Sequence, residues 1–177
     1  MTAEATLERQ ARDAAGVKAG EVLVRIYGDI AARSMRDLPV YNEKLRVEAV
    51  GFHDDGIRVI GIVATPWFMN VVVAASPLGP AAVEVSPGST VTHDLPSGAY
   101  DFVAGTLDGF GRLDSLSLFS PMFRFEDPEA VTATAEAAMA ELLRPLQPEK
   151  TETPAPTALD RRALLFGRKP RNEATAP

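Results

Sequence analysis

The fold of this chain follows from one stretch, IRVIGIVATPWFMNVVV, which runs from Ile57 to Val73. Two runs of β-branched residues flank Thr65 and Pro66, and three large apolar side chains follow at once, beginning with Trp67, the only tryptophan. β-Branched residues favour the pleated surface of a sheet, whereas proline lacks a backbone donor and holds the residue before it extended. The stretch therefore predicts a strand, a break at Thr65-Pro66 and a second strand.

The second strand is apolar on both of its faces. Because successive side chains of a strand point to opposite sides, Trp67 and Met69 should share one face, and Phe68 and Asn70 the other. Each face then needs a cover of its own.

The rest of the chain supplies more strands and two helices. Strand character between turn signals is found at residues 45–52, 91–94, 100–105 and 112–119. Apolar residues at helical spacing predict a helix over 21–35 with a frayed lead-in, because Gly16 and Gly20 weaken its continuity. Asp127-Pro128-Glu129 has the cap, the proline and the acid that begin a second helix. The sequence predicts an α+β fold: a largely antiparallel sheet of five or six strands with an N-terminal and a C-terminal helix, both on one face.

Two parts of the chain differ in composition. Residues 1–148 are expected to form one domain, whereas residues 149–177, which include the segment TETPAPT, are expected to be a flexible proline-rich tail. Residues 1–148 hold 12 basic and 20 acidic side chains, so the body should repel nucleic acid and attract a basic peptide.

Composition also excludes several classes of function. The chain has no cysteine, which excludes disulfides, thiolate zinc sites and iron–sulfur ligation. The longest apolar run, 71–75, is far shorter than the roughly 20 residues of a membrane span. The N-terminus has no apolar core of a secretory signal, so we expect a cytoplasmic protein without membrane insertion. No nucleotide loop, catalytic set or metal-ligand spacing is present, so we expect no enzyme, no cofactor and no metal.

Four segments together resemble one known family: LRVEAVGF at 45–52, TPWFMN at 65–70, GAYDFVAG at 98–105 and LFSPMFRF at 118–125. The combination is similar to the HybE-type chaperones of nickel–iron hydrogenase assembly. The resemblance implies a chaperone that is not an enzyme. Its implied partner is a hydrogenase small-subunit precursor with a twin-arginine export signal, and the large subunit is a further candidate. Its implied role is to delay export until maturation.

TPWFMN and SPMF share a small hydroxyl residue, a proline, a large apolar residue and a phenylalanine. Both segments could end strands at the same side of the predicted sheet. One interpretation is that their large side chains fill the core. The alternative hypothesis is an apolar groove for a peptide, since methionine and aromatic residues suit variable apolar partners. The groove would be formed by Trp67, Phe68, Met69, Phe119, Met122 and Phe123.

Three polar residues accompany these segments. Asn70 either ties backbone groups at the strand break or presents its amide to a bound peptide. Asp114 and Glu126, close in sequence to SPMF, could converge at the mouth of the groove and bind an arginine of the partner. Surface solvation is the plain alternative for both acids.

The tail carries a segment, LDRRALLFG at 159–167, that resembles the twin-arginine motif itself. It departs from that motif through Asp160, its short apolar stretch and its place in the chain. Our hypothesis is that Arg161 and Arg162 lead a weak internal ligand, which occupies the precursor site when no client is bound. The alternative is a basic segment that aids solubility or docks without specificity.

Two other classes of function remain. A small-molecule or cofactor-binding protein would use Trp67 and the phenylalanines to close a pocket. A hydrolase would use Ser117 or Ser120 with His93, although nothing in the spacing organises a triad. Both His53 and His93 are read more simply as surface turn residues.

Overall fold

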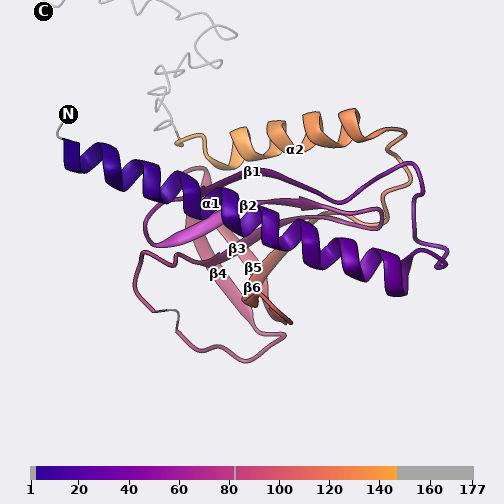
Figure 1. The fold of residues 1–177 in the computed structure, drawn as a ribbon, viewed down its shortest axis with the longest axis horizontal. Coiled ribbons are helices and arrows are strands. Elements are labelled where there is room, and N and C mark those ends of the chain that lie inside the picture. Colours follow the sequence, from indigo (N-terminus) through magenta and orange to yellow (C-terminus); the bar gives the residue numbers. More distant parts are fainter. Residues whose placement is uncertain (1–2, 82, 147–177) are drawn as a thin grey trace, which may run out of the picture. The chain divides into compact units, whose positions relative to one another are not determined.

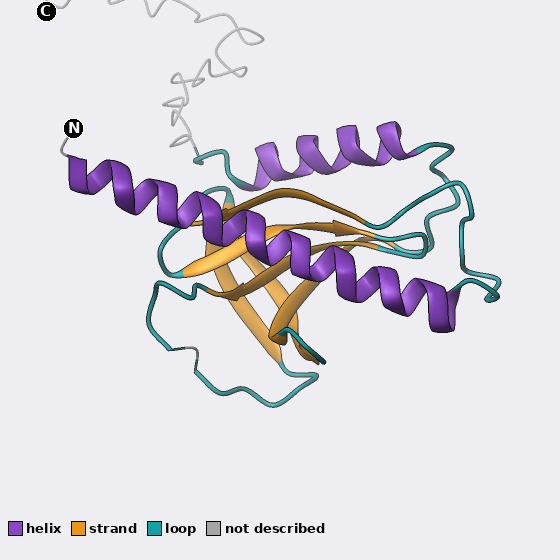
Figure 2. Ribbon diagram, viewed as in Figure 1, coloured by secondary structure: helices purple, strands orange, loops and turns teal. Residues whose placement is uncertain are grey.

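The computed structural model describes residues 3–81 and 83–146. Figures 1 and 2 show the helices packed against a sheet. The elements are α1 Ala3–Ile30, a π-helical turn η1 Ala31–Met35, β1 Glu48–Asp54, β2 Arg58–Ala64, β3 Met69–Ala75, β4 Thr90–Leu95, β5 Gly98–Leu107, β6 Gly111–Phe119 and α2 Pro128–Leu142. All neighbouring strands are antiparallel, in the order β1-β2-β3-β6-β5-β4. The predicted α+β fold is confirmed.

The stretch from Ile57 to Val73 forms the centre of this sheet. β2 and β3 pair without interruption from Arg58 opposite Ala75 to Ala64 opposite Met69. The predicted break is the tight turn of their hairpin.

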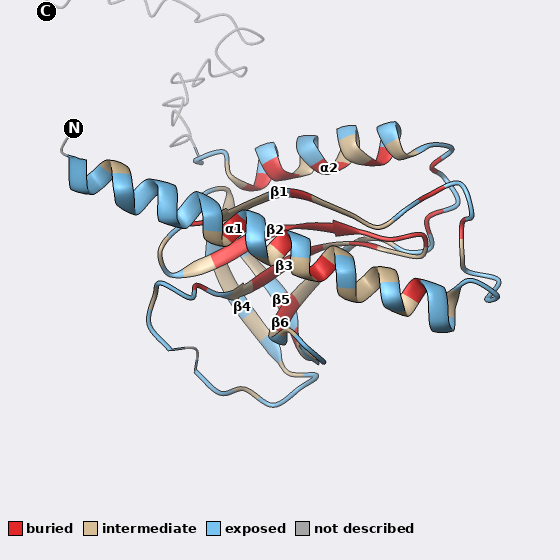
Figure 3. Ribbon diagram, in the orientation of Figure 1, coloured by how far each residue is buried: buried red, intermediate tan, exposed pale blue. Residues whose placement is uncertain are grey.

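The two helices lie on opposite faces of the sheet, so the prediction that both cover one face is wrong. Alternate residues of β2 show why: Ile62 belongs to the core cluster that includes α2, and Val63 belongs to the cluster that includes α1. Figure 1 shows α1 crossing the sheet and α2 running along β1. The buried stripes on both helices in Figure 3 face the strands. A strand that is apolar on both faces requires this two-sided cover.

Helix α1 begins at Ala3, well before the predicted start, and runs through both glycines. A Cβ at Gly16 would lie 2.6 Å from the backbone of His53, and one at Gly20 would lie 3.1 Å from the side chain of Ala49. These glycines do not fray the helix. They let it pack directly against β1, and this packing outweighs their poor helix propensity.

Helix α2 begins as predicted. Asp127 caps it by accepting a hydrogen bond from the backbone N–H of Ala130 at 2.7 Å, and Pro128 occupies the first turn. Its buried stripe comprises Val131, Ala135, Met139 and Leu142. Beyond it, Leu146 donates a backbone hydrogen bond to Pro96 in the β4–β5 hairpin. The end of α2 is thereby fastened beside β4.

Candidate functional site

The β2–β3 turn at residues 65–68 is held by its own threonine. Thr65 is fully buried, and its Oγ1 accepts hydrogen bonds from the N–H groups of Trp67 and Phe68 at 3.2 and 3.0 Å. The backbone N–H of Thr65 donates to the carbonyl of Phe68 at 2.7 Å. The small hydroxyl residue of TPWF therefore fixes the backbone that presents the two aromatic side chains.

Asn42 ties this turn to two other segments. Its backbone N–H donates to the carbonyl of Pro66 at 2.9 Å. Its buried side chain donates to the carbonyls of Met122 and Phe125, at 3.1 and 3.0 Å, and accepts from the N–H of Lys44. The sequence gives no sign of this role, because an asparagine in a loop is ordinary until its partners are known. We call the end of the molecule that Asn42 joins, residues 36–45, 65–68 and 119–126, the rim.

The rim carries a chain of aromatic contacts. Tyr41 stacks on Trp67 with ring centroids 6.2 Å apart, and Trp67 meets Phe68 edge to face at 5.6 Å. Phe68 continues the chain to Tyr27 of α1 at 5.3 Å. Burial raises the pKa of the Tyr27 hydroxyl above its usual value. An open cleft of about 590 Å³ lies beside Tyr41, between the end of α1 and residues 41–47.

The second repeat of the motif lies at the same end. Phe119 pairs with Met69, and the hydroxyl of Ser120 reaches the carbonyl of Trp67 at 3.5 Å. The Phe119 ring lies under the guanidinium of Arg124, 5.1 Å from ring centroid to Cζ, and meets Phe125 edge to face. The Phe123 side chain is 56% exposed. TPWF and SPMF thus build one surface from two strand ends.

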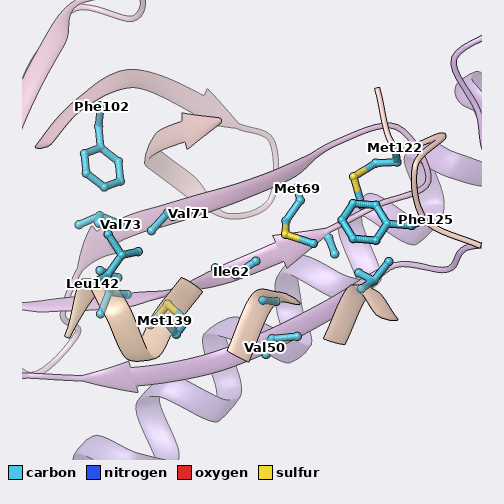
Figure 4. Packing of buried hydrophobic residues seen from close by; sticks show 14 of the residues in the cluster. Val50, Ile62, Met69, Val71, Val73, Phe102, Met122, Phe125, Met139 and Leu142 are labelled. Carbon is cyan, nitrogen blue, oxygen red and sulfur yellow. The ribbon is translucent and has the colours of Figure 1, made fainter. Parts of the chain in front are cut away.

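The two methionines are not part of that surface. Met69 and Met122 have no exposed area, and both belong to the core cluster between the sheet and α2. Figure 4 shows them among the core side chains, with Met122 next to Phe125. The expectation that they line a groove is corrected: Met69 at the start of β3 and Met122 in the loop after β6 are both buried in the core. Trp67 and Phe68 are half-buried, and Phe123 is open to solvent.

Asn70 lies on the α1 side of β3, between Val63 and Ser117. Its side-chain oxygen is buried and accepts no hydrogen bond from the described residues. The expectation that it ties backbone groups at the break is therefore not met. Thr65 performs that task.

The two predicted acids do not meet. Glu126 is exposed beside Phe125 at the rim, whereas Asp114 is buried near the start of β6, before the strand runs to the rim. Asp114 is paired instead with Arg112, at 3.0 and 2.8 Å, and with the Nε2 of His93 at 2.8 Å. A groove mouth formed by these two acids is thus ruled out.

His93 is likewise not a turn residue. It lies in β4, half-buried, with its ring edge-on to Phe102 at 5.0 Å between centroids. His53 lies in β1. Ser120 sits at the rim, at the other end of β6 from the carboxylate that His93 contacts. Ser117 pairs with Asn70 on the α1 side of the sheet, whereas Asp114 lies opposite Val73 of the α2-side core, so neither serine forms a triad with His93 and Asp114. In the part of the chain that the structure describes, no group of three or more His, Asp or Glu side chains is placed to hold a metal ion.

Two further expectations from the sequence concern the tail arginines and membrane insertion. Arg161 and Arg162 lie outside the described residues. Within residues 3–81 and 83–146, neither helix has a window apolar enough to cross a bilayer.

These features define a class of protein: a small α+β scaffold that presents a rigid, partly exposed aromatic surface on three joined loops. Comparisons with known proteins then give the family. Residues 18–167 match the model of the [NiFe]-hydrogenase assembly chaperones, HybE. The chain belongs to this family.

Individual relatives agree with that placement. Hydrogenase expression/formation protein HupJ of Bradyrhizobium diazoefficiens is 46% identical over 88% of this chain and 91% of its own. Protein HoxT of Cupriavidus necator is 38% identical over 79% and 83%. The solution structure of HybE from Escherichia coli superposes with a TM-score of 0.60 at 27% identity, covering 86% of this chain and 91% of that one.

Proposed function

We propose that this chain binds the precursor of a nickel–iron hydrogenase small subunit, with its twin-arginine signal, and delays export until the subunit has matured. The large subunit is a second candidate client. Membership of the assembly-chaperone family supports the class of client. The observation that carries the proposal is the rim, where aromatic side chains of three joined loops remain partly accessible.

The rim suits a chaperone because its shape exists before a client arrives. Asn42 and Thr65 fix three loops through hydrogen bonds to buried backbone groups, so little ordering is needed on binding. Phe123, Leu38 and Val40 are 56%, 45% and 42% exposed. Exposed apolar side chains gathered on one surface mark an interaction site, and a central aromatic residue dominates such a site.

The charge of the rim constrains what it binds. Arg124 covers Phe119, and Glu126 follows closely, so the rim is mixed rather than acidic. Its client contact should therefore be mainly apolar and only weakly sensitive to salt. The mechanism is reversible occupancy in the cytoplasm: the client's apolar surface is covered until maturation buries it within the hydrogenase.

The test is capture of the intact precursor by wild-type chain and by Phe123→Glu, with Leu7→Glu as the matched control. Leu7 is 66% exposed on α1, so the control adds the same charge at an exposed apolar position away from the rim. We expect Phe123→Glu to weaken capture about 10- to 100-fold, the effect of losing a central aromatic contact. Equal capture by both variants would overturn the rim as the client site.

The role of the signal is tested separately. The same assay is run with precursor that lacks its twin-arginine segment, and with the isolated large subunit. Undiminished capture of the shortened precursor would remove the proposed link to export.

A further inference from the structure

One edge of the sheet, β4, carries little of the usual protection: among the described residues, the Arg58 side chain binds the Asp94 carbonyl at one end of the strand. β1, at one side of the sheet, is interrupted by an irregularity between Val50 and His53 and is packed by α1. β4, at the other side, has six regular residues without proline, lysine or arginine. Natural sheets protect free edges with such residues, because an open edge pairs readily with another strand.

The hydrogen-bonding groups that β4 offers can be identified from its register. Leu95 and Gly98 close a two-residue turn, so they form a hydrogen-bonded pair, and such pairs alternate along the hairpin. The bond from Ala104 N–H to Ser89 carbonyl, at 2.9 Å, obeys this alternation. It follows that Thr90, Thr92 and Asp94 point their backbone groups away from β5. The carbonyl of Asp94 indeed points outward, since it accepts from the Arg58 side chain at 2.5 Å.

Two of these three residues are open. Thr90 and Thr92 have exposed side chains, and across the described residues their outward backbone groups have no hydrogen-bond partner. A strand laid beside β4 could therefore form an antiparallel or parallel ladder with both. This mode of recognition takes its affinity from main-chain bonds and its specificity from alternate side chains.

A cleft lies where alternate side chains of an added strand would fall. Val91 and His93 point to the α2 face of the sheet and line a cleft of about 360 Å³. Its walls are mainly aliphatic, with Val73 and Val83 among them. The charged residues that line the cleft are already paired with one another, since Arg112 and His93 both bind Asp114. The cleft therefore accepts aliphatic side chains rather than an ion.

The other face of β4 and β5, opposite the cleft, carries acidic side chains and therefore favours a basic partner. Asp94 and Asp101 are exposed on β4 and β5. Between Arg58 and Arg112 the sequence has no lysine or arginine, although it contains the acids Glu84, Asp94, Asp101 and Asp108. A basic residue next to the added strand would meet these two acids. The Thr92 hydroxyl already donates to Asp101 at 2.6 Å, and the Arg58 guanidinium lies at the backbone carbonyl of Asp94.

We propose that the β4 edge binds an extended segment of the client, in which arginines adjoin aliphatic residues that alternate along a strand. The segment adds a seventh strand, places every second side chain over the cleft and directs its arginines to Asp94 and Asp101. The identity of the client rests on the proposed function, but the surface does not, because β4 and the rim are separate.

The test uses the full chain and a fluorescein-labelled synthetic peptide with two arginines followed by alternating valine and threonine. Two further peptides carry backbone N-methyl groups, one on the even and one on the odd residues of the alternating part. In strand addition only one set of amides faces β4. We expect one methylated series to bind at least tenfold more weakly and the other to retain its affinity in fluorescence anisotropy. Equal effects in the two series, or no binding of the parent peptide, would overturn the proposal.

Variants of the chain locate the site. Thr92→Pro removes an outward N–H that has no role in the pairing with β5, so the fold should persist while peptide affinity falls at least fivefold. Thr92→Ser keeps that N–H and also the hydroxyl that donates to Asp101, so it is the matched control. The double change Asp94→Asn with Asp101→Asn should weaken binding three- to tenfold at low salt, whereas Asp13→Asn on α1 should not.

The outcomes separate this inference from the proposed function. Peptide binding that is indifferent to Thr92→Pro and to both methylation patterns rejects the β4 edge, even if precursor capture at the rim stands. Circular dichroism of each variant guards against misfolding. If Thr92→Pro fails to fold, the methylated peptides on wild-type chain still decide the question.

Discussion

Replacement of Asn42 by alanine is the most informative perturbation of this fold, because one side chain joins the three segments of the rim. The change removes the donors to the carbonyls of Met122 and Phe125 and the acceptor for Lys44 N–H. A buried polar group that loses its partner costs about 1–3 kcal/mol, and entry of water recovers part of this. We expect a loss of about 2–4 kcal/mol in the free energy of unfolding. That is a large share of the roughly 5–15 kcal/mol of a typical domain.

Two probes distinguish global from local loss. Urea unfolding followed by far-ultraviolet circular dichroism measures the whole domain, and fluorescence of Trp67, the only tryptophan, measures the rim. Ser120→Ala removes a long, exposed bond and should cost less than about 0.5 kcal/mol. A similarly small loss for Asn42→Ala would refute the view that Asn42 holds the rim.

Asn42→Asp adds a pH dependence with a definite sign. The new carboxylate keeps the acceptor for Lys44 but faces two carbonyl oxygens, so the folded state should raise its pKa above the unfolded value of about 3.9. A raised acid pKa favours folding at low pH and disfavours it as pH rises. The variant should therefore be less stable than Asn42→Ala at pH 7 and recover relative to it towards pH 4.

The remaining predictions concern packing, the turn and the tail. Gly16→Ala should lower the free energy of unfolding by about 1–3 kcal/mol, because its Cβ meets the β1 backbone. Gly28→Ala, whose Cβ has nothing within 4 Å, should raise it by up to about 1 kcal/mol. Thermal unfolding measures both variants, and changes of the same sign would contradict the account of α1. Thr65→Val should cost about 1–3 kcal/mol in urea unfolding, because two turn N–H groups lose their acceptor; an unchanged midpoint would argue against this role. Truncation after Pro148 should raise client affinity if the Arg161-Arg162 segment inhibits and lower it if the segment recruits. Unaltered affinity would end both hypotheses.

Most of the fold can be predicted from the sequence, because local preferences and tertiary packing favour the same structure in most places. The β-branched runs on either side of Thr65-Pro66 predict the two central strands and the break between them, which the structure shows to be a hairpin turn. Asp127-Pro128 predicts the start of α2. They disagree at Gly16 and Gly20, where contact with β1 overrides helix propensity. A single sequence holds no sign of that contact.

The site is less predictable for a related reason. The alternation of side chains along a strand correctly places Met69 and Phe68 on opposite faces of the sheet. It does not predict which face a helix covers, or which residues lie beyond the end of the sheet. Met122 and Phe123 are neighbours in sequence, yet one is buried and the other is mostly exposed. The partners of Asn42 and Asp114 are distant in sequence, so their roles appear only when the segments meet.

The rim and the β4 edge lie at opposite ends of one strand, which limits how a client could use both. Ala64 of β2 adjoins the rim turn, whereas Arg58, at the other end of β2, contacts β4. Six steps at about 3.3 Å separate them by about 20 Å. A client that presents an apolar surface to the rim therefore needs about six extended residues to reach the edge. Binding at two linked surfaces multiplies affinity through effective concentration. Loss of either surface should consequently leave weak capture, and only Phe123→Glu combined with Thr92→Pro should abolish it.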